Sequence, residues 1–221
     1  MKTVILGEYG YEWALLGLSK SFKLRRIPHK EWWTKERFEK LKKTATGMAH
    51  KDGGHNKFLE SIVVWIDIEA PRAWWQEFDT YRVGMTKQSD STMHTIHKGE
   101  VLYDDFESNT DEKMVDLFNE ILRDVTNNFT KKSRLSGCDL QRVKLALPEG
   151  FLQSRVVCTN YKTLRNMFIQ RHNHNFTQWE HFICDVYEQV EHPELLPKEA
   201  YKKALSVFDK GIPDDEDLIF R

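Results

Sequence analysis

Apolar residues recur along the chain in two spacings, which predict a mixture of strands and helices. The β-branched run Ile62–Glu69 (IVVWIDIE) predicts the surest strand, and Thr3–Gly7 and Phe151–Cys158 predict two more. Helical spacing predicts helices over Lys30–Lys43, Pro71–Phe78, Thr110–Asn128, Asp139–Leu145, the segment from Tyr161, Phe176–Val190 and Lys198–Phe208. Two polar passages, Thr44–Asn56 and Gly84–Thr95, are predicted to be loops. Because no repeat or linker interrupts this pattern, we expect a single α+β domain over residues 1–221.

The composition is that of a globular protein with a sizeable core. The chain has 221 residues, of which 40% are hydrophobic and 30% are charged. A net charge of −1 provides no positive field for wrapping nucleic acid, so a nucleic-acid partner is not expected. Its three cysteines form no Cys-x-x-Cys pair, which is typical of reduced cytoplasmic thiols. No apolar run has membrane-spanning length and the start is too polar for a signal peptide, so we expect a cytoplasmic protein without a membrane partner.

Several chemically suggestive groups have a simpler interpretation. His172 and His174 resemble a metal pair, but no acidic or cysteine ligand stands at suitable spacing, so a polar helix terminus is favoured and no metal site is expected. His181 and Cys184 suggest nucleophilic catalysis, yet their apolar helix favours core packing. Paired tryptophans stack on bases or flavins in some proteins; here we expect one ring of each pair in the core and one at an interface, at Trp32-Trp33 and Trp74-Trp75.

The segment from Leu147 to Glu180 carries the most specific pattern of polar residues. Asn160 stands where a helix N-cap is expected. Lys162 and Asn166 are four residues apart and share one face of the predicted helix. Arg171 lies roughly 140° around the helix from Asn166 and serves a different surface. Polar groups that point in two directions suit a site built at a junction.

Arginine side chains in polar surroundings have two interpretations. Arg82 and Arg171, with Lys144 and Lys162 as further cations, form a plausible clamp for a phosphate or a pyrimidine carbonyl. The alternative is that they form ordinary surface ion pairs.

The order of these polar residues resembles that of the flavin-dependent thymidylate synthases. That family carries a Leu-Pro, an Asn-x-Arg, an Asn, an Arg and a closing Gln-x-Glu. The corresponding residues here are Leu147-Pro148, Asn160, Lys162, Asn166, Arg171 and Gln178-Trp179-Glu180. Lys162 replaces the Arg of Asn-x-Arg, and one extra residue precedes Gln178.

An earlier block, from His55 to Lys87, also follows the family pattern and leads into its signature motif. The signature is Arg-His-Arg-x-x-Ser-x-Asn-Glu-x-Ser-x-Arg-Tyr, and the chain keeps Arg82 and, after a one-residue insertion, Ser91. Among the changed positions, Thr80 and Tyr81 stand for Arg-His, Lys87 and Gln88 for Asn-Glu, and Met93 and His94 for Arg-Tyr.

The resemblance implies a fold, a reaction and a set of site residues. The expected fold is an antiparallel-rich sheet that includes Ile62–Glu69 and Phe151–Cys158 and is covered by the helices Thr110–Asn128 and Phe176–Val190. The implied reaction is reductive methylation of dUMP to dTMP, with FAD as cofactor and methylenetetrahydrofolate and NADPH as co-substrates. Residue matching assigns His55, Arg82, Asn160, Lys162 and Asn166 to FAD, Gln88, Ser91, Thr92 and Lys144 to the nucleotide, and Arg171 to the pyrimidine edge as the catalytic residue. Family members are homotetramers with sites at subunit junctions.

The altered signature leaves two alternatives open. One is the same fold modifying another pyrimidine nucleotide, for example by hydroxymethylation. The other is a flavin-free remnant that binds nucleotides or serves as an assembly subunit.

Overall fold

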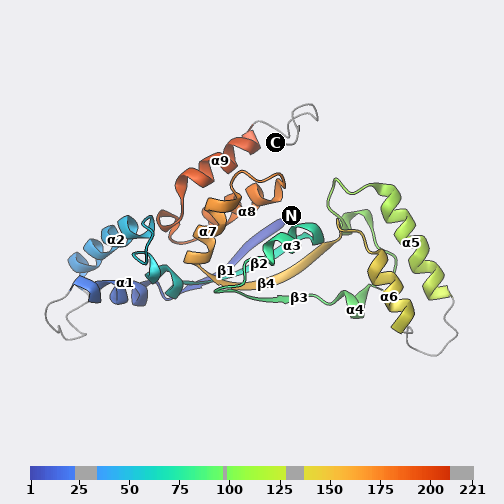
Figure 1. The fold of residues 1–221 in the computed structure, drawn as a ribbon, viewed down its shortest axis with the longest axis horizontal. Coiled ribbons are helices and arrows are strands. Elements are labelled where there is room, and N and C mark those ends of the chain that lie inside the picture. The colour runs from blue at the N-terminus through green and yellow to red at the C-terminus, as the bar shows by residue number, and fades with distance from the viewer. Residues whose placement is uncertain (23–33, 97–98, 128–136, 210–221) are drawn as a thin grey trace. The chain divides into compact units, whose positions relative to one another are not determined.

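The computed structural model describes residues 1–22, 34–96, 99–127 and 137–209 (Figure 1). The predicted helix Lys30–Lys43 lies partly outside these ranges, and so do Trp32 and Trp33. Its described part belongs to α2, which runs over Lys35–Ala49. No helix within the described ranges is both long and apolar enough to cross a membrane.

Four antiparallel strands form the sheet, in the order β1-β2-β4-β3. The strands are β1 (Lys2–Tyr9), β2 (Val63–Pro71), β3 (Thr86–Ser89) and β4 (Leu152–Asn160). In β2 the buried side chains Val64, Ile66 and Ile68 alternate with less buried ones, as expected of a strand with one face on a core. The predicted antiparallel sheet with Ile62–Glu69 and Phe151–Cys158 as strands is therefore confirmed.

Strand β1 lies at one edge of the sheet, and a glutamine side chain covers part of that edge. The Ile5 backbone N–H donates to Gln189 Oε1 over 3.1 Å. The Gln189 Nε2 group donates to the Thr3 carbonyl oxygen over 2.9 Å. Gln189 is the last residue of α8 (Gln178–Gln189), so the helix end is tied to the strand.

Residue contacts divide the chain into two compact units. Unit 1 comprises residues 1–2, 68–80 and 88–156, and unit 2 comprises residues 3–67, 81–87 and 157–221. Both β2 and β4 contribute residues to each unit. The expectation of a single domain remains a prediction.

In unit 1, helix α5 (Glu112–Asn127) packs against α6 (Gly137–Ala146). The buried residues of this cluster are Ile96, Val101, Phe106, Val115, Phe118, Leu122, Val125, Val143 and Leu147. None of them belongs to a strand, so the expectation that this helix covers the sheet is wrong. Its apolar stripe finds partners in a neighbouring helix and in connecting segments instead.

Helix α3 (Arg72–Phe78), also in unit 1, begins directly after Pro71, as predicted. Trp74 and Trp75 are 0% and 1% exposed, and their ring centroids lie 5.1 Å apart. The expectation that one ring faces an interface is wrong for this pair, since both are buried with Phe78. Their burial anchors the segment that leads toward the altered signature.

Unit 2 contains α1 (Tyr11–Ser19), α2, α7 (Tyr161–Arg171), α8 and α9 (Lys198–Asp209). Figure 1 shows α8 and α9 side by side, and the Tyr187 and Tyr201 rings stack between them with centroids 4.2 Å apart.

Two predicted loops are partly wrong. Helix α2 continues to Ala49 within the predicted loop Thr44–Asn56. Strand β3 and the short helix α4 (Thr92–Thr95) occupy the predicted loop Gly84–Thr95, where β3 belongs to the sheet next to β4.

Candidate functional site

Asn160 fixes the start of α7. Its side-chain Oδ1 accepts a hydrogen bond from the Thr163 backbone N–H over 3.0 Å, which confirms the predicted N-cap. Its Nδ2 group donates to the Gly84 carbonyl oxygen over 3.4 Å. The side chain is only 8% exposed. Asn160 therefore joins the helix start to the segment of unit 2 that contains the altered signature.

Lys162 and Asn166 occupy one face of α7, as predicted from their spacing. The Lys162 ammonium donates to the Asn56 Oδ1 atom. Asn56 is fully buried and also donates from Nδ2 to the Ala49 carbonyl oxygen over 3.4 Å. Asn166, one turn further along α7, is half-buried. Lys162 is thus held beside the loop that carries His55.

Arg165 was not identified from the sequence, although it ties α7 to the same loop. Its Nη1 lies 3.2 Å from Asp52 Oδ1. Its side chain is 7% exposed, whereas that of Asp52 is 83% exposed. The pair restrains a loop that contains two glycines with positive φ, Gly53 at 71° and Gly54 at 87°. Arg165 and Asp52 are too far apart along the chain for a local motif to indicate this ion pair.

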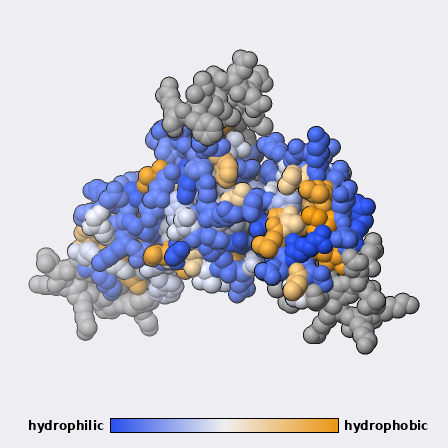
Figure 2. All heavy atoms as spheres, turned by 45° about the vertical axis from the view of Figure 1, so that its right-hand side comes forward, coloured by the Kyte–Doolittle hydropathy of each residue, from blue (hydrophilic) through white to orange (hydrophobic). Residues whose placement is uncertain are grey.

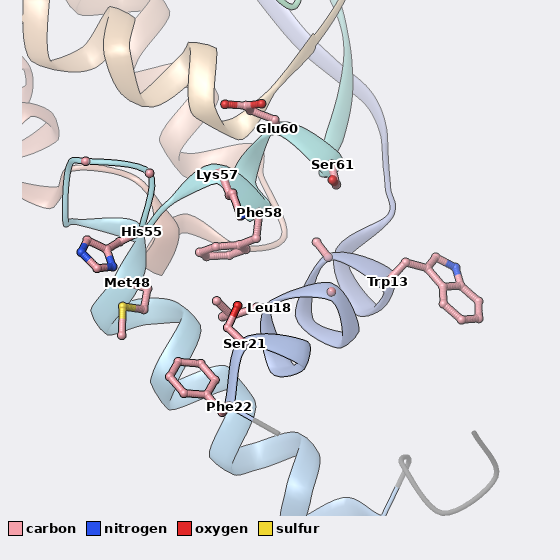
Figure 3. A pocket seen from close by; sticks show the side chains of 14 residues that line it. Trp13, Leu18, Ser21, Phe22, Met48, His55, Lys57, Phe58, Glu60 and Ser61 are labelled. Atoms are coloured by element: carbon pink, nitrogen blue, oxygen red, sulfur yellow. The ribbon is translucent and has the colours of Figure 1, made fainter. Parts of the chain in front are cut away.

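His55 lies on the wall of an open cavity of about 810 Å³ in unit 2 (Figure 3). The cavity is lined by Trp13, Ala14, Gly17, Leu18, Ser21, Phe22, Met48, Gly53, Gly54, His55, Lys57, Phe58, Glu60 and Ser61. In Figure 3 the Leu18, Phe22 and Phe58 side chains lie around the opening, and Trp13 points outward at its edge. A Cβ atom added to Gly53 or Gly54 meets no atom within 4 Å, so both peptides leave space for a ligand. Mostly apolar walls with a few polar groups are typical of sites for planar organic ligands.

Arg171, at the end of α7, is held by two aromatic side chains. Its Nε group donates to the Tyr81 hydroxyl over 3.1 Å. Its guanidinium carbon lies 5.0 Å from the Trp179 ring centroid and 5.7 Å from that of Tyr81. Both distances are within the range of cation–π attraction. As predicted, Arg171 serves a different surface from Lys162.

Arg82 follows Tyr81 directly, and its side chain is exposed. The backbone of this segment is anchored by two hydrogen bonds from polar side chains. Thr163 Oγ1 donates to the Val83 carbonyl oxygen, and Thr159 Oγ1 donates to the Gly84 carbonyl oxygen, each over 3.2 Å. These bonds from α7 and β4 hold the backbone directly after Arg82 in place.

In unit 1, the structure brings together two of the four residues assigned to the nucleotide. The Lys144 ammonium, on α6, donates to the Thr92 hydroxyl at the start of α4. Partial burial lowers the pKa of Lys144, and the nearby positive charge of Arg72 lowers it further. Ser91 occupies the N-cap position of α4, and Gln88 lies on β3. Both of these side chains are exposed.

Arg72 is a second cation in this part of unit 1 that was not identified from the sequence. Its Nη1 donates to the Leu147 carbonyl oxygen over 2.7 Å, and its Nη2 lies 3.3 Å from Glu149 Oε1. These contacts fix the Leu-Pro turn that follows Lys144. Glu149 balances part of the Arg72 charge, and the remainder still lowers the pKa of Lys144.

The histidine and cysteine groups occupy structural positions. His172 is the C-cap residue of α7, and its Nδ1 lies 3.1 Å from the Phe168 carbonyl oxygen. Cys184 is buried in α8, and burial raises the pKa of its thiol to about 12. Such a thiol is protonated at neutral pH and is a poor nucleophile. Within the described residues, no group of three or more His, Cys, Asp or Glu side chains is placed to hold a metal ion.

Known proteins resemble this chain in family and in fold. Residues 21–191 match the family model described as thymidylate synthase complementing protein. No curated protein sequence matches the chain. A solved structure of the flavin-dependent thymidylate synthase ThyX from Helicobacter pylori, complexed with FAD and dUMP, is 13% identical, with a TM-score of 0.68 over 90% of this chain and 99% of that one. A second ThyX structure from the same organism, with the same ligands, is 14% identical, with a TM-score of 0.70 over 91% of this chain and 100% of that one.

The family match includes α7 with its cap, the cavity residues from His55 onward, and the segments that carry Lys144 and Thr92. At these identities the two solved structures establish the fold, and the family model establishes the relationship. The chain belongs to the thymidylate synthase complementing protein family.

Proposed function

We propose that this chain is a flavin-dependent thymidylate synthase that converts dUMP to dTMP by reductive methylation. The methylene carbon of methylenetetrahydrofolate leaves its two folate nitrogens and is joined to C5 of the uracil ring in place of the C5 proton. A hydride from NADPH completes the methyl group, and the two nitrogens take up the equivalent of the C5 proton and one further proton from solvent. Tetrahydrofolate and NADP⁺ are the other products. The observation that carries the proposal is the family match over residues 21–191, within which Asn160, Asn166 and Arg171 keep the family order.

FAD, when bound, supplies the hydride carrier between NADPH and the transferred carbon. In our proposal His55, Arg82, Asn160, Lys162 and Asn166 hold it, all within unit 2. The cavity beside His55 fits such a ligand, because its volume of about 810 Å³ and apolar walls suit a ring system. Lys57 on the cavity wall and Lys162 near the same loop supply positive charge for a diphosphate.

Asn160 contributes to that site in an indirect way. Its polar atoms are bonded to the Thr163 N–H and the Gly84 carbonyl oxygen, and the side chain is nearly buried. We therefore assign it the task of fixing the start of α7, so that Lys162 and Asn166 are oriented before the cofactor binds. Orientation in advance lowers the entropy cost of binding.

The nucleotide is assigned to unit 1, through Gln88, Ser91, Thr92 and Lys144. Lys144 and Thr92 are already in contact, and Arg72 adds a second positive charge nearby. A doubly charged phosphate relieves the repulsion between two such cations. Thr92 and Ser91 add hydroxyl groups at the start of α4 that can donate to phosphate oxygens.

Arg171 is the residue to which we assign catalysis. Contact with the pyrimidine edge lets its guanidinium stabilise the negative charge that develops on N3 or O4 during carbon transfer. A fixed charge that requires no reorganisation is among the largest catalytic effects. The rings of Tyr81 and Trp179 hold the Arg171 guanidinium in place, so its charge is fixed in this sense.

The assembly and location follow the same proposal. We assign the chain to a homotetramer in the cytoplasm. The assembly is proposed because α7 presents polar groups in two directions. In addition, apolar side chains remain exposed in unit 1: Leu117 on α5 is 49% exposed and Leu145 on α6 is 80% exposed. Figure 2 shows apolar surface on the side of the molecule that carries these helices. Exposed apolar patches commonly mark subunit contacts. Light scattering that reports a monomer at every concentration would contradict the assembly.

A second candidate function is favoured by the altered signature. Thr80, Tyr81, Lys87 and Gln88 replace four polar residues of the family motif. These changes suit a relative that acts on another pyrimidine nucleotide, or that transfers a hydroxymethyl group in place of a methyl group. In the second case the methylene carbon is hydrated, and no hydride is consumed.

Mass spectrometry decides between these functions. The purified protein is first examined for yellow colour and for flavin released on heating; a colourless protein without flavin indicates a nucleotide-binding or assembly subunit. The flavin-loaded protein is then given dUMP, methylenetetrahydrofolate and NADPH. Formation of dTMP supports the proposal. Conversion of dUMP to a hydroxymethyl product without NADPH oxidation, or conversion of a different pyrimidine nucleotide only, supports the second candidate.

A further inference from the structure

Tyr81 stands where the family signature has its histidine, and it contacts the residue assigned to catalysis. The Tyr81 hydroxyl accepts the Arg171 Nε–H over 3.1 Å and donates to Gln170 Oε1 over 2.9 Å. A phenol has one proton to donate, so the donation to Gln170 leaves the oxygen lone pairs for Arg171. The hydroxyl orientation is therefore set from both sides.

The ring of Tyr81 belongs to the same cluster. It meets the Trp179 ring edge to face, with centroids 6.2 Å apart at an angle of 65°. Trp179 is fully buried, and the Arg171 guanidinium carbon lies 5.0 Å from its ring centroid. The guanidinium thus has a hydrogen-bonding partner at Nε and aromatic partners at two rings. Together these contacts restrict rotation of a long side chain that otherwise loses considerable entropy when it is ordered.

The backbone that carries Tyr81 is tied to the helix that carries Arg171. Thr163 and Asn160, at the start of α7, donate to the carbonyl oxygens of Val83 and Gly84. Both partners of the Tyr81–Arg171 contact therefore belong to one anchored piece of unit 2.

We propose that Tyr81 is a positioning residue that fixes the Arg171 guanidinium for its contact with the pyrimidine. This inference rests on the proposed function, since it concerns the orientation of the residue assigned to catalysis. The mechanism requires the hydroxyl specifically, because it is the part of Tyr81 that accepts the Nε–H. A tyrosine present only for packing would tolerate loss of that oxygen.

The test compares Tyr81→Phe with Tyr201→Phe. Tyr201 provides a matched control, because its hydroxyl also donates to a side chain of unit 2, Glu188 Oε1, over 2.9 Å and it belongs to no assigned site. With dUMP as the varied substrate, Tyr81→Phe is expected to lower kcat by about ten- to a hundredfold, as misplacement of a catalytic group does. The KM for dUMP should change much less, and Tyr201→Phe should match the wild type.

A double variant shows whether Tyr81 acts through Arg171. Lysine has a methylene group where arginine has Nε, so in an Arg171→Lys protein the Tyr81→Phe change no longer removes a bond to Nε. The bond from the hydroxyl to Gln170 is lost in both backgrounds and therefore cancels from the comparison. The kcat of the double variant should therefore equal that of Arg171→Lys alone. Independent, multiplicative losses would overturn the proposal, and so would a Tyr81→Phe enzyme with wild-type kcat.

A measurement without substrate separates this inference from the proposed function. In protein labelled with ¹⁵N-arginine, exchange of the Arg171 Nε–H with water should be slow in the wild type and in Tyr201→Phe, and fast in Tyr81→Phe. If the wild type forms no dTMP but shows this pattern, the proposed function fails and the positioning contact stands. Equal exchange in all three proteins would overturn the inference whatever the activity.

Discussion

The side-chain amide of Asn160 donates to the carbonyl oxygen of Gly84, 76 residues earlier in the chain, over 3.4 Å. The same side chain caps α7, so one residue both starts the helix and holds the altered signature segment against it. Gly84 has φ of 69°, a conformation that side chains other than glycine rarely adopt. Residues assigned to the cofactor therefore depend on a backbone position that requires glycine.

Gly84→Ala should destabilise the protein more than Gly53→Ala. Both glycines have similar positive φ, 69° and 71°, so both changes carry a conformational cost of about 1 kcal/mol or more. At Gly84 the new Cβ atom also lies 2.5 Å from Asn160 Nδ2, whereas at Gly53 it meets nothing within 4 Å. Displacing Asn160 weakens the cap, which adds about 1 kcal/mol. Equal free energies of unfolding in urea would show that the Asn160 contact is unimportant.

Arg171→Lys should reduce turnover well beyond its effect on stability. Lysine keeps the charge but loses the planar donor group and the contact with the Tyr81 hydroxyl. Removal of one preorganised donor typically lowers kcat by about a hundredfold or more. The rate is followed as tritium released from C5 of labelled dUMP, with flavin content and melting temperature measured alongside. A variant with wild-type turnover would show that Arg171 is not catalytic.

Lys144 should make nucleotide affinity sensitive to alkaline pH. Burial and the charge of Arg72 lower its pKa, so it loses its proton at a lower pH than an exposed lysine. The affinity for dUMP should then fall as the pH rises through that lowered value. In Lys144→Arg the guanidinium stays protonated, and the alkaline decline should disappear. Calorimetric titrations of both proteins with dUMP provide the comparison; an unchanged decline in the arginine variant would exclude Lys144 as its cause.

Glu180 should make folding stability depend on pH in the acidic range. The side chain is 4% exposed, and burial raises its pKa above the usual 4.5. The folded protein then binds this proton more tightly than the unfolded chain does, so the contribution of Glu180 to stability falls as the pH rises from 4.5 through the raised value. The free energy of unfolding of the wild type, relative to that of Glu180→Gln, should therefore decrease over this pH interval. At pH values above the interval the difference between the two proteins should be constant.

The control for this experiment is Glu120→Gln, which removes the same charge from an exposed position on α5. Urea unfolding is measured for the three proteins from pH 4.5 to neutrality. A Glu120→Gln protein that diverges from the wild type as Glu180→Gln does would attribute the effect to net charge. In that case burial of Glu180 would not be the cause.

Local signals predicted the strands β1, β2 and β4 and the helix cap, because a few neighbouring residues determine them. The β-branched run of β2 and the Asn160 cap are examples. The predicted range of helix α2 ended too early. Its last two turns bury Ala45 and Ala49 in place of large apolar residues, and small residues give a weak periodic signal. Strand β3 has no apolar pattern at all, so its pairing in the sheet determines its structure.

The site residues were predicted by type and order, but not by partner. Lys162 contacts Asn56, 106 residues away, and Arg171 contacts Tyr81, 90 residues away. No local periodicity encodes contacts at such separations. Tyr81 therefore appeared in the sequence only as a departure from the signature, and its hydrogen bonds to Arg171 and Gln170 give it a structural meaning.

The Gln189 side chain has a further consequence for the exposed edge of β1. Its amide group presents one acceptor to the Ile5 N–H and one donor to the Thr3 carbonyl, as the peptide group of an adjoining strand does. It therefore imitates one residue of a fifth strand. Unsatisfied edges are templates on which other chains pair and aggregate. A single glutamine at the end of α8 thus protects this part of the sheet edge from uncontrolled strand addition.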